Sequence, residues 1–119
     1  MTMLKRYAPH LLWLLPAIVF LFAGGAKLAG VPELHQSFQM MGLPGWFGYF
    51  IGACEVAGAV GLALPRTRRL AAVGLAIIMV GAAYFHIAYD VPSPVPAMVL
   101  LVMLIAVASM GWRGRHAAA

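Results

Sequence analysis

Four long apolar runs occupy most of this 119-residue chain and restrict what it can fold into. An α-helix of about 20 apolar residues is long enough to cross a hydrocarbon layer of about 30 Å. Hydrophobic residues make up 64% of the chain and charged residues only 9%, whereas a soluble domain has about 25% charged residues. Because backbone groups in lipid must bond internally, helices are favoured. We therefore predict that residues 1–119 form a single all-α domain, a bundle of four transmembrane helices at about 11–30, 46–64, 70–89 and 95–112.

The connector between the first two runs predicts a short helix of its own. The segment PELHQSFQMM begins at Pro32 and is followed by Gly42, and these residue types suit the first position and the end of a helix. Its apolar residues share one face with the residues that flank it: Val31, Leu34, Phe38 and Met41. We expect an interfacial helix across the mouth of the bundle, acting either as a lid over an outward-facing pocket or as a plain connector on the lipid headgroups.

Positive charge gathers at one end of the predicted bundle. Seven of the eight Lys and Arg residues fall within 5–6, 66–69 and 113–115, whereas Glu33 and Asp90 lie on the opposite side. The positive-inside rule then places both termini in the cytoplasm. Basic residues with interleaved aromatics would indicate nucleic-acid binding, but these clusters form no such stripe, so we expect no nucleic-acid partner.

Glu55 is the only charged residue in the second apolar run. It comes nine residues after Trp46, which at about 1.5 Å per residue places it roughly 13 Å deep, close to the bilayer midplane. An unpaired charge there costs about 2.5–3.5 kcal/mol on insertion scales. Glu55 must therefore face the bundle and be either protonated or paired.

Lys27 and His86 are the candidate partners of Glu55, because each lies about one turn from the outer end of its predicted helix. We predict that Lys27, Glu55 and His86 form one polar cluster that binds a ligand or relays a proton. Small residues beside Glu55 favour close helix packing. The pocket around this cluster would be lined by Tyr49, Tyr89 and Gly52.

Each member of this cluster also has a structural interpretation. Lys27 would simply extend its ammonium to the headgroups, His86 would be a neutral interfacial residue, and Glu55 would only fix helix packing. No metal is expected, because the outer His, Glu and Asp residues show no recognisable ligand spacing. The single Cys54 excludes an intramolecular disulfide and a Cys-x-x-Cys redox pair.

The order of these motifs resembles the DoxX-like family of small four-helix membrane proteins. The matching segments are FAGGAKLAG at 22–30, PELHQSFQMMGLP at 32–44, and IGACEVAGAVGLALPRTRRLAAVGLAIIMVGAAYFHI at 51–87. The resemblance covers residues 23–86, and the fourth apolar run adds only general hydrophobicity. It implies a multi-pass bundle in the bacterial inner membrane, with Lys27, Glu55 and His86 at the family's recurring polar positions.

The resemblance also directs the functional hypothesis, since the family is associated with quinone-linked sulfur oxidation. The chain carries no dithiol, haem-attachment motif or nucleotide-binding fingerprint, so no cofactor is expected within it and any electrons would belong to a bound ligand or a partner. Our first hypothesis is an auxiliary subunit that binds a quinone or another lipophilic molecule for a membrane oxidoreductase or detoxification system. A membrane or periplasmic redox partner would complete that system.

Two other functions fit the same residues. The chain would be a non-catalytic assembly module with a stable partner or a homo-oligomeric state, or else a minimal transporter or proton conductor. Whether it is an enzyme stays open, and no catalytic residue is assigned. Replacing Glu55 with Gln would abolish ligand retention under the first hypothesis and change mainly the thermal stability in an assembly module.

Overall fold

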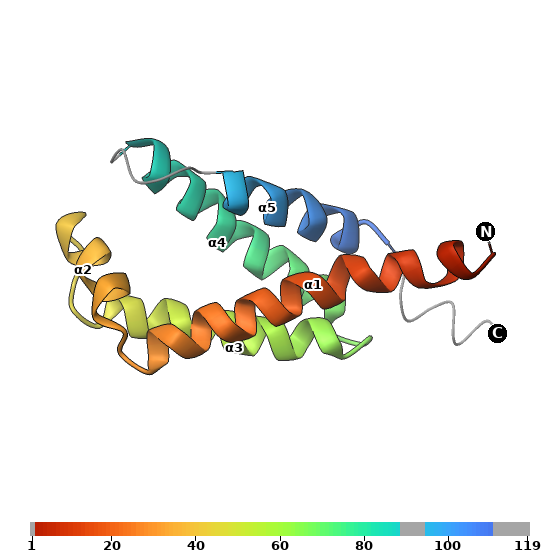
Figure 1. Cartoon of the computed structure of the whole chain (residues 1–119), viewed down its shortest axis with the longest axis horizontal. Helices are drawn as coiled ribbons and strands as arrows, with labels where there is room; N and C mark the ends of the chain where they lie inside the picture. The colour runs from red at the N-terminus through yellow and green to blue at the C-terminus, as the bar shows by residue number, and fades with distance from the viewer. Residues whose placement is uncertain (1, 89–94, 111–119) are drawn as a thin grey trace.

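The computed structural model describes residues 2–88 and 95–110, and this part of the chain is built from helices (Figure 1). The all-α prediction is confirmed, including the short helix between the first two apolar runs. The elements are α1 (Thr2–Leu28), α2 (Pro32–Met40), α3 (Phe47–Ala63), α4 (Arg68–Ala88) and α5 (Val95–Ala108).

Helix α1 begins nine residues before the start that the apolar run predicts. It continues through Pro9 and Pro16 and includes the polar segment that precedes Leu11. A hydrophobic run marks only the part of a helix that contacts apolar surroundings, and polar turns at either end extend beyond it. The same effect places Arg68 and Arg69 inside α4, two residues before the predicted start. Residues 111–112, at the end of the last predicted helix, lie outside the described residues.

The four long helices form a ring. Helix α1 packs along α3, α3 contacts α4, α4 packs along α5, and α5 returns to α1. Figure 1 shows α1 beside α3 and α4 beside α5, with α2 at the end of the bundle away from the N-terminus. The most completely buried side chains come from each helix of the ring and include Phe20, Leu62, Leu75 and Leu104, each 1% exposed or less. This core lies toward the end of the bundle that carries the turn between α3 and α4.

Arginine side chains close that end of the bundle, which we call the base. The Arg68 Nε donates a hydrogen bond of 2.6 Å to the Leu62 carbonyl oxygen, and the guanidinium lies 4.0 Å above the Trp13 ring. The Arg69 Nε donates to the Ala108 carbonyl oxygen over 2.9 Å. The last carbonyls of a helix have no partner within it. The two arginines therefore cap the C-terminal ends of α3 and α5.

Helices α1 and α2 are each followed by a turn that contains a glycine. Gly30 and Gly42 have φ angles of +81° and +80°, a left-handed conformation that glycine adopts without steric cost. After α2, Gly42 N–H donates to the Gln39 carbonyl and Leu43 N–H to the Phe38 carbonyl, over 2.9 and 3.1 Å. This pattern is a Schellman motif. It stops α2 after only nine residues and turns the chain toward α3.

Two helices in the described part of the chain are long and apolar enough to cross a membrane, at Tyr7–Leu28 and Arg68–Ala88. Helices α3 and α5 are also apolar but shorter, with 17 and 14 residues. Large apolar side chains cover much of the outer surface, including Phe22, Leu70, Ile87 and Val102. A surface of this kind is unusual for a soluble monomer.

Candidate functional site

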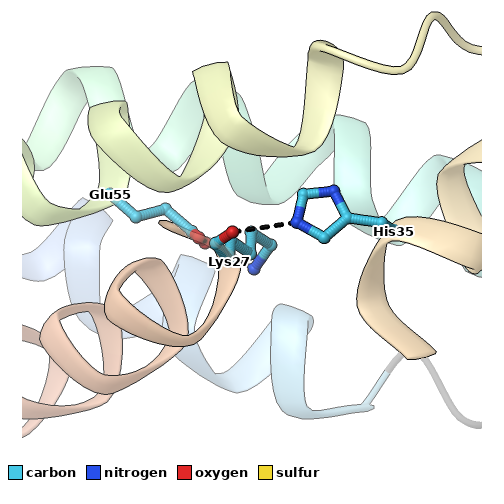
Figure 2. Close-up of polar contacts among 3 residues, drawn as sticks. All are labelled: Lys27, His35 and Glu55. Carbon is cyan, nitrogen blue, oxygen red and sulfur yellow. Dashed lines mark hydrogen bonds and ion pairs between the residues drawn. The ribbon is translucent and has the colours of Figure 1, made fainter. Parts of the chain in front are cut away.

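Lys27 and Glu55 form an ion pair between α1 and α3. The Lys27 Nζ lies 2.8 Å from Glu55 Oε1, and Figure 2 shows the Glu55 side chain reaching to Lys27. Their side chains are 14% and 4% exposed, respectively. Lys27 comes from the last turn of α1 and Glu55 from the middle of α3. A charge-assisted hydrogen bond of this length gives the buried Glu55 carboxylate a partner and uses one of the donors of the part-buried Lys27 ammonium.

A close approach of two glycines brings this pair together. A Cβ atom built on Gly24 would lie 2.6 Å from the Gly52 carbonyl oxygen, and one built on Gly52 would lie 2.8 Å from the Lys27 Cβ. Only glycine fits at either position without moving a backbone. The structure places Gly52, a predicted pocket residue, at the buried contact between α1 and α3 rather than on a cavity wall.

His35 attaches α2 to the same site. Its Nε2 lies 2.8 Å from the Lys27 carbonyl oxygen, so the ring nitrogen must carry the proton and donate it (Figure 2). That carbonyl also accepts the Gly30 N–H over 3.1 Å in the turn after α1. The imidazole stacks on the Tyr49 ring with 4.3 Å between the ring centroids, and it packs against Gly48. The short helix is therefore held across the ends of α1 and α3.

Residue types and spacing alone did not identify His35 as part of this site. Among the described residues no three His, Cys, Asp or Glu side chains gather where they could hold a metal ion, and His35 belongs to the site through its hydrogen bond to Lys27. The available signal was its position on α2 opposite a glycine and a tyrosine at the start of α3. Tyr49, predicted to line the pocket, instead stacks on this histidine. The predicted pocket residue Tyr89 lies outside the described residues.

A cavity of about 550 Å³ lies beside the ion pair, inside the ring of helices. This volume is within the roughly 300–1,000 Å³ typical of small-molecule sites. Lys27, Glu55 and His86 all line it, from α1, α3 and α4 respectively. The structure thus gathers the three predicted polar residues on one cavity and shows the first two in direct contact.

The rest of the cavity wall is apolar. Phe38 and Met41 line it from α2 and the turn that follows, and Phe47 and Phe85 add aromatic surface from α3 and α4. The cavity communicates with the surface of the bundle, because the lining residues Val19 and Ile77 are also 43% and 68% exposed. The site is therefore an apolar space, reachable from outside, with a compact polar group in its wall.

Comparison with known proteins places this chain in a family. Residues 11–109, most of the chain, match the sequence model of the DoxX-like family. Neither the curated proteins nor the solved structures contain a significant match. The matched range includes all three polar residues that line the cavity. The chain belongs to the DoxX-like family.

Proposed function

We propose that this small membrane protein binds a lipophilic molecule, such as a quinone, in the cavity between its helices. It would act as an auxiliary subunit of a membrane oxidoreductase or detoxification system. The observation that carries the proposal is the part-buried Lys27–Glu55 pair in the wall of a cavity that is otherwise apolar apart from His86. Family membership and the two long apolar helices support the membrane assignment.

The ion pair needs an explanation other than stability. Burying two charges costs desolvation energy that their attraction often fails to recover, and apolar replacements of similar volume are frequently neutral or stabilising. The contact between Gly24 and Gly52 already packs α1 against α3. A charged pair that adds little to packing and borders a cavity is better explained by contact with a ligand.

The arrangement of the site indicates how a ligand would be held. Phe38, Phe47 and Phe85 would cover its apolar body. An ammonium group has three donors, and Glu55 takes one from Lys27. Lys27 and His86 would donate to an oxygen of the ligand, and Glu55 would accept or relay a proton. These roles describe binding, and no residue is assigned a catalytic step.

We further propose that α1, α3, α4 and α5 all cross the bacterial inner membrane, with both termini in the cytoplasm. At about 1.5 Å per residue, the 17 residues of α3 and 14 of α5 measure roughly 25 and 21 Å. Both lengths are below the roughly 30 Å of an average hydrocarbon layer, and local thinning of the bilayer accommodates such a mismatch at modest cost. The base, with Arg66, Arg68 and Arg69, would face the cytoplasm, and α2 would face outward.

Mass spectrometry of small molecules that copurify with the protein tests the binding proposal. The wild type is compared with Glu55→Gln, which removes the charge of the pair, and with Gly81→Phe. Gly81 lines the cavity, and a Cβ there meets no atom within 4 Å, so a phenylalanine extends into open space. The control is Gly74→Phe, two turns earlier on α4, where a Cβ also meets nothing within 4 Å but the residue does not line the cavity.

The proposal predicts one molecule that is retained by the wild type and by Gly74→Phe. Its amount should fall at least about tenfold in Glu55→Gln and Gly81→Phe, which corresponds to about 1.4 kcal/mol of lost binding. Bulk phospholipid alone, in equal amounts in all four proteins, would mean that no molecule is bound specifically in the cavity, and the proposal would be wrong. A stable partner or homo-oligomer without any ligand would instead support an assembly module.

A further inference from the structure

We propose that Glu55 sets the charge of the ligand, so that the cavity accepts a neutral, oxygen-bearing head group and rejects both anionic and cationic ones. This inference depends on the proposed function, because it concerns a ligand in the same cavity. It goes further by assigning specificity to Glu55, whose side chain is 4% exposed and lies 2.8 Å from Lys27, the only lysine among the described residues that line the cavity.

The charged side chains in the cavity wall balance each other. Among the described residues that line it, Lys27 and Glu55 are the charged side chains, and their charges cancel. The remaining lining residues are apolar apart from His86. A ligand that enters the cavity therefore meets the dipole of the Lys27–Glu55 pair rather than a net charge.

A charged head group is costly to place beside this pair. A carboxylate or phosphate drawn to the Lys27 ammonium would lie within a few ångströms of the Glu55 carboxylate, because that carboxylate is itself only 2.8 Å from Nζ. Like charges this close repel strongly where water is scarce. An ammonium head group meets the corresponding repulsion from Lys27. In both cases the ligand brings a charge that the wall cannot neutralise, and an unpaired charge is costly to bury.

A neutral oxygen binds beside the pair without adding a charge. A carbonyl or hydroxyl oxygen can accept one of the ammonium donors that Glu55 does not use, and it leaves the ion pair intact. The apolar body of such a ligand replaces water against Phe38, Phe47 and Phe85. The substrate class is therefore a neutral lipophile with an acceptor oxygen at one end.

A matched set of three radiolabelled probes tests this selection: 2-tridecanone, dodecanoate and dodecylamine. Binding is measured to the full-length protein in lipid nanodiscs, which avoids competition from detergent. The amount bound to Gly81→Phe is subtracted as partition into the lipid. The wild type should bind the ketone at least about tenfold more tightly than either charged probe.

Substitutions of the pair should then switch the preference. In Glu55→Gln the Lys27 ammonium loses its counter-charge, so dodecanoate should become the preferred probe. In Lys27→Met the Glu55 carboxyl loses its partner and the ammonium of dodecylamine can replace it, so dodecylamine should be preferred. The ranking in the wild type decides the question by itself if either single variant fails to fold.

The outcomes separate the two proposals. A wild type that binds dodecanoate more tightly than the ketone overturns the charge selection and leaves a ligand-binding cavity in place. A preference that is the same in the wild type and in a folded Glu55→Gln variant also overturns it. Cavity-specific binding of none of the three probes overturns the proposed function together with the inference.

Discussion

Alanine at Gly24 should destabilise the protein, because this glycine lies where α1 and α3 approach most closely. The new Cβ would lie 2.6 Å from the Gly52 carbonyl oxygen, 2.9 Å from Val56 Cγ2 and 3.0 Å from Glu55 Cβ. The first distance is about 0.8 Å short of the 3.4 Å at which ordinary contact begins, and a backbone oxygen cannot rotate away. The two helices must separate instead.

The size of the effect follows from two opposing terms. Overpacking that moves a backbone costs about 1–3 kcal/mol. Replacing glycine with alanine inside a helix returns roughly 0.5–1 kcal/mol, because the unfolded chain loses conformational freedom. We expect a net loss of about 1–2 kcal/mol in the free energy of unfolding, measured by denaturant titration of the purified protein in one fixed detergent.

The neighbouring glycine provides the matched control. A Cβ on Gly25 meets no atom within 4 Å, so Gly25→Ala keeps only the favourable helix term and should stabilise by about 0.5–1 kcal/mol. The same substitution at two adjacent positions is thus predicted to change the free energy of unfolding in opposite directions. If Gly24→Ala were as stable as Gly25→Ala, α1 and α3 could not approach as closely as described, and the explanation for the Lys27–Glu55 contact would be wrong.

Three further predictions concern the base, the short helix and the topology. Arg68→Ala should lower the free energy of unfolding by about 2–4 kcal/mol, because the last carbonyls of α3 lose a charged donor, whereas the exposed Arg66→Ala should change it by less than about 0.5 kcal/mol in the same titration. His35→Ala should speed amide hydrogen exchange in α2 at least about tenfold without a comparable change in the middle of α3, and equal exchange in both proteins would contradict the attachment of α2 through this histidine. A fluorescent protein fused to either terminus should fluoresce in cells and alkaline phosphatase fused there should be inactive, while an active phosphatase at one terminus would contradict the cytoplasmic placement of both.

The helices could be predicted from the sequence because each carries a strong local signal. Apolar runs marked the four long helices, and Pro32 and Gly42 marked the ends of the connector that became α2. The starts of α1 and α4 could not be placed as well, because the polar turns there continue the helix without any change in backbone preference. The hydropathy of a segment indicates whether it lies in apolar surroundings. It does not indicate where the helical hydrogen bonds begin.

The residues of the candidate site could be predicted only where burying an unpaired charge would be costly. The cost of an unpaired Glu55 in an apolar run pointed to Lys27 as a partner, and the structure shows that contact. The role of His35 could not be predicted, because its hydrogen-bond partner is a backbone carbonyl. Every residue has such a group, so the sequence does not show which one is the partner. The role of Arg68 was hidden for the same reason: the charge pattern alone marks a cytoplasmic turn, but its guanidinium caps two carbonyls of α3.

The ion pair between α1 and α3 has a consequence for how this chain enters a membrane. Lys27 and Glu55 are 28 positions apart, so a ribosome releases the cation well before the anion. Alone in lipid, α3 would carry an unpaired Glu55 charge, which costs about 2.5–3.5 kcal/mol near the centre of the bilayer, and α1 would carry the unpaired Lys27 charge in its last turn. In contact, the Lys27 and Glu55 side chains cancel each other's charge. If α1 and α3 both cross the bilayer, as proposed above, their entry as a pair would therefore avoid the cost of an unpaired charge in lipid.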